Sequence, residues 1–283
     1  MPATAAGLLQ KGQEQLRLAG IDTAELDARL LLQEATGWSH ARLVGASEES
    51  VDPSTASIYT QFLTRRSNRE PVSKIVGCRE FWSLDFIVNP SVLDPRPDTE
   101  TLVEAVLAAI DDKSAALTIV DLGTGSGCIL VALLSELPNA QGIAVDKSPE
   151  ALAVAQQNAQ HHGVADRITF TCSNWGQALP DACCDIVVSN PPYIESDDLP
   201  GLMPEVLHHD PAMALDGGDD GLTAYRQIAA DLPRLLVAGG QAYLELGAGQ
   251  GPDVSALLEE VGASNIRVID DLAGIGRCIC CCC

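Results

Sequence analysis

The sequence predicts an α/β fold, in which an open and mostly parallel β-sheet is covered by helices on both faces and follows a smaller helical region. Two observations lead to this prediction. Short apolar segments typical of buried strands alternate with helical segments between residues 117 and 269, and the first 68 residues show only helical patterns. The length of 283 residues fits a small plus a medium domain, and 46% hydrophobic residues suffice for a globular core.

The chain is strongly acidic, since 17 Lys and Arg residues stand against 39 Asp and Glu residues and leave a formal net charge of −22. This charge argues against broad electrostatic binding to nucleic-acid phosphates, which needs clustered Lys and Arg. It leaves room for a local basic groove or a basic protein partner, and it equally fits an adaptation to solubility or high salt. No export signal or membrane-spanning apolar stretch is evident, so we expect a cytoplasmic protein.

The N-terminal region, up to about residue 68, is expected to form helices. Asp22 caps one helix, Glu25 completes a capping box, and Gly37 ends that helix. Its buried face is predicted to carry Leu26, Leu30 and Leu31. The dipeptide Asp52-Pro53 opens another helix. Because these segments carry no obvious chemistry, the region either docks a partner or covers the next domain.

Between residues 71 and 97 the hydrophobic period changes from helical to alternating. Phe86 and Val88 alternate with Asp85, which indicates a β-hairpin. Pro95 and Pro97 then begin a helix with an apolar face. We therefore expect a helical domain at residues 1–70, a β-hairpin linker at 71–97 and the α/β domain at 98–283.

Within the α/β domain, apolar runs and turn residues define the elements in order. Strands are predicted at 117–122, 142–145, 168–171, 186–189, 242–246 and 266–269, and helices at 128–137, 149–161, 222–236 and 254–261. The cysteine-rich tail at residues 278–283 has no zinc-ligand spacing. We interpret it as an aberrant terminus without a function and expect no metal site.

A glycine-rich loop follows the first strand of this domain. It consists of Gly123, Thr124, Gly125, Ser126 and Gly127. Glycine allows a positive φ and close approach of a ligand, and the helix that follows offers free N–H groups. Asp146 ends the next strand about 20 residues later, where a carboxylate can accept both hydroxyls of a ribose. The spacing indicates a nucleoside cofactor, although any tight strand-to-helix turn can use glycines.

The identity of that cofactor depends on the spacing of the glycines. Cys128 stands where a dinucleotide fingerprint needs a small residue, so the loop reads G-x-G-x-G. This pattern resembles the S-adenosylmethionine loop of class I methyltransferases, in which the glycines face the methionine portion of the cofactor. The resemblance implies that Asp121 engages the ammonium group, but an Asp at a strand end is equally a turn or capping residue.

A second motif, Asn190-Pro191-Pro192-Tyr193, ends another strand at the same edge of the sheet. The Asn190 side-chain oxygen and the Pro191 carbonyl can together accept both hydrogens of one planar –NH₂ group. Tyr193 offers a ring face for a flat substrate. A rigid strand-ending turn is the alternative interpretation. Next to a cofactor loop we favour an amide pocket, with Asn190 and Pro191 as the catalytic residues.

Further segments resemble one family, the bacterial peptide chain release factor N5-glutamine methyltransferases (the HemK family). They are Glu70-Pro71-Val72, Glu80-Phe81-Trp82, Val92-Leu93-Asp94-Pro95-Arg96-Pro97-Asp98-Thr99-Glu100, Asp210-Pro211 and the stretch 217–222. The similarity covers most of the chain. It implies a class I, Rossmann-like methyltransferase domain with a mostly parallel seven-stranded sheet, a small N-terminal helical domain and a β-hairpin linker. It also implies that the helical domain and hairpin dock a release factor whose Gly-Gly-Gln loop inserts its glutamine beside the cofactor.

The resemblance also assigns roles to individual residues. Residues 123–127, Asp146, Trp175 and Asn190 are implied to contact S-adenosylmethionine, and residues 190–193 to form the glutamine pocket. Arg96 and Glu100 either steer the substrate or form an ordinary pair of surface charges. Some positions depart from the family pattern: Asn174 is often Asp, Asp94 replaces an apolar residue, Asp210 replaces Glu, and the cysteine tail replaces a basic ending.

The function expected from this resemblance is methyl transfer from S-adenosyl-L-methionine to the glutamine N5 of release factors, with S-adenosyl-L-homocysteine as product. We expect a monomer that contacts neither membrane nor nucleic acid. The alternatives are a glutamine methyltransferase of a ribosomal protein, a DNA adenine-N6 methyltransferase, and a cofactor-binding regulator without turnover. The acidic charge and the lack of a DNA-recognition domain disfavour the DNA enzyme.

Overall fold

A computed structural model describes residues 3–283, so Met1 and Pro2, the first two residues of the expected helical domain, lie outside the described residues. The chain forms two compact units. The first comprises Met1–Cys78 and Met203–His209, and the second comprises Arg79–Leu202 and Asp210–Cys283. None of the helices in the described part of the chain is long and apolar enough to cross a membrane.

The first unit is a helical bundle with a short two-stranded sheet. Its helices are α1 (Ala5–Leu18), α2 (Ala24–Thr36), α3 (His40–Gly45), α4 (Pro53–Ser67) and α5 (Val72–Val76), and its strands are β1 (Ala3–Thr4) and β2 (Ser50–Val51). Leu16, Leu31 and Leu63 are fully buried in its core. The Tyr59 hydroxyl donates to the Ala28 carbonyl at 3.1 Å and joins α4 to α2.

The predicted end of α2 and the predicted start of α4 are confirmed, but the predicted start of α2 is wrong. Gly37 ends α2 with a φ of 66°, and the Asp52 side chain accepts from the Thr55 N–H at the start of α4. The cap residue of α2 is Thr23 and not Asp22. The Thr23 hydroxyl donates to the Asp27 carboxylate at 2.8 Å across the first turn.

The predicted face of α2 is also wrong in part. Leu26 and Leu30 are exposed, and only Leu31 of the three leucines is buried. The helix instead turns Ala24, Ala28, Leu31 and Leu32 inward. The buried Arg66 guanidinium holds the Asp27 carboxylate at 2.7 Å and thereby sets the rotation of the helix.

Helix α9 (Pro204–His209) belongs to the first unit although it lies far along the chain. The Glu205 carboxylate accepts from Arg66 at 3.0 Å and from Arg69 at 3.3 Å. The Lys74 ammonium donates to the His209 carbonyl at 3.2 Å. These cations bind the helix to α4 and to the residues that follow it.

The second unit contains a seven-stranded sheet in the order β10-β11-β9-β8-β5-β6-β7. The strands are β5 (Thr118–Leu122), β6 (Gln141–Asp146), β7 (Ile168–Cys172), β8 (Cys184–Ser189), β9 (Leu236–Glu245), β10 (Ser264–Asp270) and β11 (Gly276–Cys282). Neighbours pair in parallel except β11, which is antiparallel to both β9 and β10. The expected mostly parallel, seven-stranded α/β sheet is confirmed.

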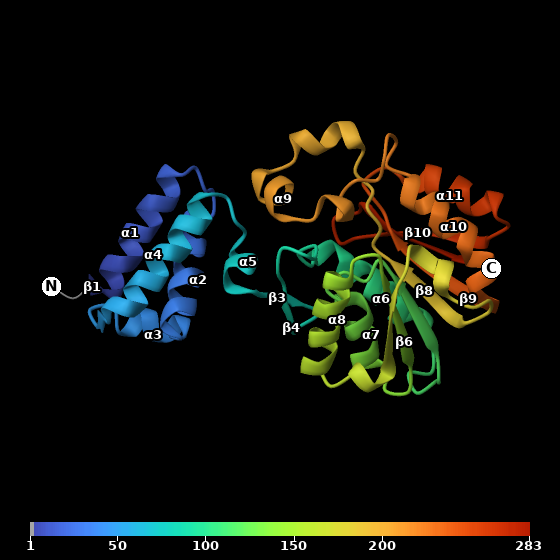
Figure 1. Cartoon of the computed structure of the whole chain (residues 1–283), viewed down its shortest axis with the longest axis horizontal. Helices are drawn as coiled ribbons and strands as arrows, with labels where there is room; N and C mark the ends of the chain where they lie inside the picture. The colour runs from blue at the N-terminus through green and yellow to red at the C-terminus, as the bar shows by residue number, and fades with distance from the viewer. Residues whose placement is uncertain (1–2) are drawn as a thin grey trace. The chain divides into compact units, whose positions relative to one another are not determined.

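Helices cover both faces of this sheet (Figure 1). On one face lie α6 (Glu100–Ala109), α7 (Cys128–Glu136) and α8 (Pro149–His161), and on the other lie α10 (Thr223–Leu235) and α11 (Gly251–Glu260). Alternate residues of one strand point to opposite faces, so Ile119 packs with the first group while Val120 packs with the second. Because helices bury both faces of the sheet, the strands consist of continuous apolar runs.

The β-hairpin is confirmed as β3 (Cys78–Phe81) and β4 (Leu84–Ile87), which form a separate two-stranded sheet. Its turn residues Trp82 and Ser83 both have positive φ angles, of 54° and 57°. The Asn158 side chain on α8 bonds both the N–H and the carbonyl of Ile87, at 2.7 and 3.0 Å. These two hydrogen bonds fix the hairpin against α8, one of the helices that cover the seven-stranded sheet.

The interpretation of the cysteine tail as an aberrant terminus is wrong. Residues 276–282 form β11, which lies inside the sheet between β9 and β10. Cys278 and Cys280 pack on one face, and Ile279 and Cys281 on the other. A thiol behaves as a small hydrophobe, so alternating cysteines can serve as a buried strand.

Candidate active site

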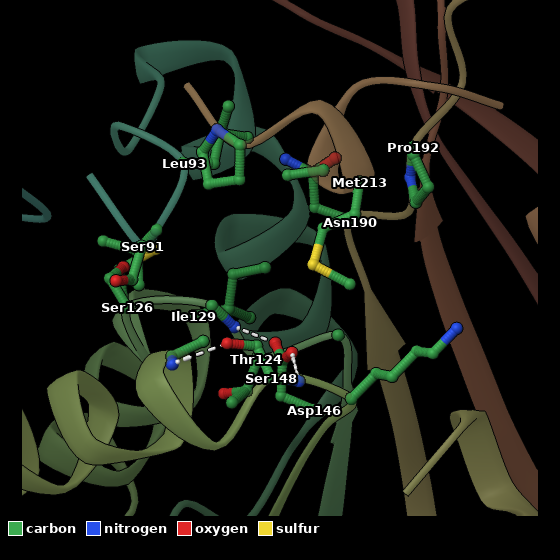
Figure 2. A pocket seen from close by; sticks show the side chains of 18 of the residues that line it. Ser91, Leu93, Thr124, Ser126, Ile129, Asp146, Ser148, Asn190, Pro192 and Met213 are labelled. Atoms are coloured by element: carbon green, nitrogen blue, oxygen red, sulfur yellow. Dashed lines mark hydrogen bonds between the residues drawn. The ribbon is translucent and has the colours of Figure 1, made fainter. Parts of the chain in front are cut away.

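A cavity opens at the carboxyl ends of β5, β6 and β8, with about 990 Å³ of empty space, part of it open to solvent. Of the site residues expected from the sequence, those that line it are Arg96, Gly123, Thr124, Gly125, Ser126, Asp146, Trp175, Asn190 and Pro192. In Figure 2, Asn190 and Met213 lie across the cavity from Asp146 and Ser148.

The glycine loop needs glycine for two different reasons. Gly123, Gly125 and Gly127 all have positive φ angles, of 76°, 55° and 79°. A Cβ atom on Gly123 would lie 3.3 Å from the Trp175 ring, so this glycine keeps the floor of the cavity open. Gly127 does not line the cavity. Its missing Cβ would lie 3.1 Å from that of Ala155, so it allows α7 to approach α8.

Asp146, at the end of β6, is held by the backbone on both sides. Its Oδ2 accepts from the Gly125 N–H and its Oδ1 from the Ser148 N–H, both at 2.9 Å. Each carboxylate oxygen can accept a further hydrogen bond. The residue therefore presents two oriented acceptors to the cavity, which suits a pair of vicinal hydroxyls.

Asp121, at β5, does not line the cavity and is fully buried beneath the loop. Its Oδ2 accepts from the Thr124 hydroxyl at 2.7 Å. Burial is the main reason that the pKa of Asp121 is raised to about 7; the hydrogen bond from Thr124 opposes the shift, and the nearby Asp146 adds to it. Within residues 3–283 its Oδ1 has no hydrogen-bond partner. Contact of Asp121 with a cofactor ammonium stays a prediction.

Asn190 follows β8 and points into the cavity (Figure 2). Its Nδ2 donates to the Thr99 hydroxyl oxygen at 3.1 Å. This bond uses a donor of the amide and leaves the Oδ1 acceptor for a ligand. The preceding residue, Ser189, donates from its hydroxyl to the Leu122 carbonyl at 2.6 Å and ties the end of β8 to β5.

The remaining residues of the Asn-Pro-Pro-Tyr motif are placed differently. Pro192 lines the cavity, whereas Pro191 and Tyr193 do not. The Tyr193 hydroxyl lies 3.5 Å from Glu245 Oε1, and the Tyr193 carbonyl accepts from Gln250 at 3.0 Å. Burial raises the pKa of Tyr193 to about 12. Stacking of its ring on a substrate stays a prediction.

Arg96 and Glu100 have different partners. The Arg96 guanidinium pairs at 2.7 Å with the buried Asp210 carboxylate and lines the cavity beside it. Glu100 does not line the cavity, and it accepts from the Trp82 N–H in the hairpin turn at 2.8 Å. Arg96 is thus available to a ligand, while Glu100 fixes the hairpin.

Sequence reasoning missed several residues of the cavity wall. They include Ser91, Leu93, Thr99, Ser148 and Met213. Ser148 caps α8 by accepting from the Ala151 N–H, and such a Ser-Pro pair at a helix start is detectable in sequence. Met213 carried no comparable signal, because it comes from an irregular segment whose position depends on the tertiary fold.

Comparisons with known proteins show the family of this chain. The PrmC N-terminal domain family matches residues 7–77, and a methyltransferase domain family matches residues 113–215. A release factor glutamine methyltransferase of Rhodospirillum rubrum is 44% identical over 96% of this chain and 83% of its own length. That of Cereibacter sphaeroides is 45% identical over 97% of both chains. This chain belongs to the release factor glutamine methyltransferase family.

Membership in the release factor glutamine methyltransferase family confirms the resemblance seen in the sequence. A similar fold also occurs in a protein of low sequence identity. The solved structure of the hMettl16 catalytic domain matches this chain with a TM-score of 0.60 at 16% identity, and the match covers 76% of this chain and 82% of that one. Within residues 3–283, no group of three or more His, Cys, Asp or Glu side chains could hold a metal ion.

The positions that depart from the family pattern occupy distinct places. Asn174 lines the cavity, and its Nδ2 lies 3.5 Å from Gln227 Oε1. Asp94 is buried, as the usual apolar residue would be. Asp210 anchors Arg96, which is a role that a carboxylate of either length can perform. Asn174 and Asp210 thus keep polar side chains at the site, whereas Asp94 adds a buried carboxyl group outside the cavity lining.

Proposed function

We propose that this chain transfers the methyl group of S-adenosyl-L-methionine to the side-chain amide nitrogen (N5) of the glutamine in the Gly-Gly-Gln motif of peptide chain release factors. One observation carries the proposal: the amide of Asn190 shares a cavity with the glycine loop and with Asp146. A cofactor cradle and an acceptor for a planar –NH₂ group therefore line the same cavity.

The residues present fit S-adenosylmethionine. Asp146 offers two oriented acceptors for the ribose hydroxyls, and Gly123 leaves room beside Trp175 that a Cβ would fill. The N-terminal end of α7 faces the loop with its positive dipole end, which suits the carboxylate of the methionine portion. When bound, the sulfonium supplies an activated methyl group. Asp121 and Thr124 then support the loop from below.

The chain's own residues orient the nucleophile. An amide nitrogen is a poor nucleophile because its lone pair is delocalised. Asn190 Oδ1 accepts one N–H of the glutamine amide, and the Pro191 carbonyl is proposed to accept the other, although Pro191 does not line the cavity. These two bonds hold the plane of the amide and favour the positive charge that develops on nitrogen. Alignment of this kind contributes up to roughly 7–11 kcal/mol in the best intramolecular cases. No separate base is assigned, and the proton leaves after methyl transfer.

The helical domain and the hairpin are proposed to dock the release factor, with boundaries at residues 1–70, 71–97 and 98–283. We propose a cytoplasmic monomer that contacts no nucleic acid directly. The acidic charge of −22 would favour a basic surface on the partner.

The test is methyl transfer from labelled S-adenosylmethionine to purified release factor, ribosomal proteins and DNA in parallel. Label on the glutamine of the release factor alone is expected. Asn190→Ala should reduce transfer at least 100-fold while cofactor binding changes much less, because it removes the acceptor for the substrate. Label on ribosomal protein or on DNA would replace the proposed substrate. Cofactor binding without any transfer would indicate a regulator.

A further inference from the structure

Asn190 can act as an acceptor only if its amide is turned the right way round. The two ends of a carboxamide have nearly the same shape, but one end donates and the other accepts. With the amide reversed, its –NH₂ group would face the –NH₂ group of the substrate. Some other residue must therefore determine which end of Asn190 faces the cavity.

Thr99 is the neighbour that meets the other end of this amide. Its hydroxyl oxygen accepts from Asn190 Nδ2 at 3.1 Å, and only 2% of Thr99 is exposed. A hydroxyl has a single hydrogen, so the direction of its own bond decides whether it can accept from Asn190 or must donate to it. The nearby Glu245 side chain has a buried carboxylate oxygen, Oε2, with no hydrogen-bond partner within residues 3–283. Its interaction with Thr99 lowers the pKa of Glu245.

Glu245 is the last residue of β9, beside the end of β8. Ser189 pairs with Leu244 in the sheet, so Asn190 and Glu245 continue from adjacent positions of two parallel strands. Only 2% of Glu245 is exposed. As a carboxylate, Glu245 accepts and cannot donate, so its free oxygen can take the hydrogen of Thr99 and leave the hydroxyl oxygen to accept from Asn190.

Building on the proposed function, we propose that Thr99 and Glu245 are positioning residues that orient the Asn190 amide with its oxygen toward the substrate. The chain of donors runs from Asn190 Nδ2 to Thr99 and from Thr99 to Glu245. Neither Thr99 nor Glu245 needs to touch the reacting atoms. Their effect is to make one of the two amide orientations the stable one before substrate arrives.

The surroundings of Glu245 make this orientation dependent on pH. Burial raises the pKa of Glu245 to about 7, and the negative charge of Asp98 raises it further. Thr99, Arg277 and Tyr193 lower this pKa and so oppose the shift. Arg277 pairs with Asp98 at 3.0 Å and with Asp271 at 3.3 Å, while Cys278 is the β11 partner of Glu245. The Tyr225 hydroxyl and Cys128 also lie nearby.

Protonated Glu245 can donate to Thr99, which then donates to Asn190 Oδ1 and stabilises the reversed amide.

Kinetic tests use Thr99→Val, which keeps the shape and removes the hydroxyl, and Thr99→Ser, which keeps the hydroxyl. At saturating cofactor and release factor, Thr99→Val should lower kcat at least tenfold, with the Kd for S-adenosylmethionine within threefold of the parent value. Thr99→Ser should retain kcat within threefold. The exposed Thr169→Val is a matched control. Parental kcat in Thr99→Val, or equal loss in Thr99→Ser, overturns the proposal.

A Glu245→Gln variant tests the other member of the pair and serves if Thr99→Val does not fold. Its carboxamide can either accept from Thr99 or donate to it, so it no longer fixes the direction of the hydroxyl, and kcat should be severalfold lower at every pH. The parent kcat should rise with pH through about 7 as Glu245 ionises, and this rise should be absent in Glu245→Gln. A variant profile that follows the parent profile would contradict the positioning role.

A measurement without release factor separates this inference from the proposed function. In ¹⁵N-labelled protein, the Asn190 side-chain amide, assigned by its loss in Asn190→Ala, should show a protected, hydrogen-bonded proton. That protection should disappear in Thr99→Val and persist in Thr99→Ser. If the parent protein transfers no methyl group to release factors, the proposed function fails, and this spectrum still decides the orientation. An unprotected amide in the parent protein overturns the inference.

Discussion

At the scale of single residues, the site depends on side chains whose hydrogen-bonding direction is set by their neighbours. Asp146 is directed by two backbone N–H groups, and Asn190 by the Thr99 hydroxyl. Asp121, by contrast, is buried under the loop and supports Thr124. Residue type alone therefore did not separate the side chains that line the cavity from those that support it.

Asp146→Asn should weaken S-adenosylmethionine binding by roughly 10- to 150-fold, because hydrogen bonds to a charged group contribute about 1.5–3 kcal/mol. An Asn side chain can accept at only one oxygen, so its –NH₂ group would face one of the two N–H donors. Isothermal titration calorimetry with the cofactor measures the change. Asp166→Asn removes the same charge at an exposed position and should leave Kd unchanged. Equal affinities of the two variants would argue against ribose binding by Asp146.

At the scale of elements, prediction succeeded where local chemistry determines the structure. Helix α8 spans the predicted residues 149–161, with Ser148 as its cap. The rotation of α2 was missed because the ion pair of Asp27 with Arg66, 39 positions away, determines it. Strand β11 was missed because alternating cysteines were not treated as apolar residues. The ends of β5, β6 and β8 were well predicted, and so was the clustering of Asp146 and Asn190.

The packing of α7 against α8 gives a prediction at this scale. Gly127→Ala places a Cβ at 3.1 Å from that of Ala155 in a backbone with a φ of 79°. Gly163→Ala has a similar φ of 69° and nothing within 4 Å of the new atom. In both variants the left-handed backbone should lower the free energy of unfolding by about 1–2 kcal/mol. Gly127→Ala should lose about 1–3 kcal/mol more from overpacking.

Urea unfolding of both variants and the parent protein measures the difference. The Gly163→Ala variant calibrates the backbone cost, so the excess loss in Gly127→Ala reports the helix contact. Equal free energies of unfolding for the two variants would show that α8 moves to accommodate the methyl group and that Gly127 is not required for close packing.

At the scale of the whole molecule, the parallel sheet gathers polar groups at one edge. Asp121, Asp146, Asn190 and Glu245 all lie at or just beyond the carboxyl ends of their strands. This gathering could be predicted from the alternation of strands and helices, whereas the burial of Asp121 and Glu245 could not. It places two carboxyl groups in low-dielectric surroundings, where their charged forms are destabilised.

The pH dependence of stability should reveal these two carboxyl groups. The pKa of Asp121 is raised from 3.8, and that of Glu245 from 4.5, each to about 7 and each mainly by burial. At a pH between the unfolded and the folded pKa of each group, the folded chain binds more protons than the unfolded chain. Their stabilising contribution is therefore complete below about pH 4 and is lost as pH rises through 7. At about 1.36 kcal/mol per pKa unit, each group contributes at most about 3–4 kcal/mol.

We expect the free energy of unfolding of the parent protein to fall between pH 5 and pH 8. Carboxyl groups with lowered pKa values, such as Glu70 beside Arg65, titrate below this window and do not mask the fall. Asp121→Asn and Glu245→Gln should each reduce the slope, and the double variant should remove most of it, since the other titrating groups are common to all four proteins. Urea unfolding at several pH values measures these slopes. Identical slopes in the parent and double variant would mean that both carboxyl groups ionise as readily in the folded chain as in water.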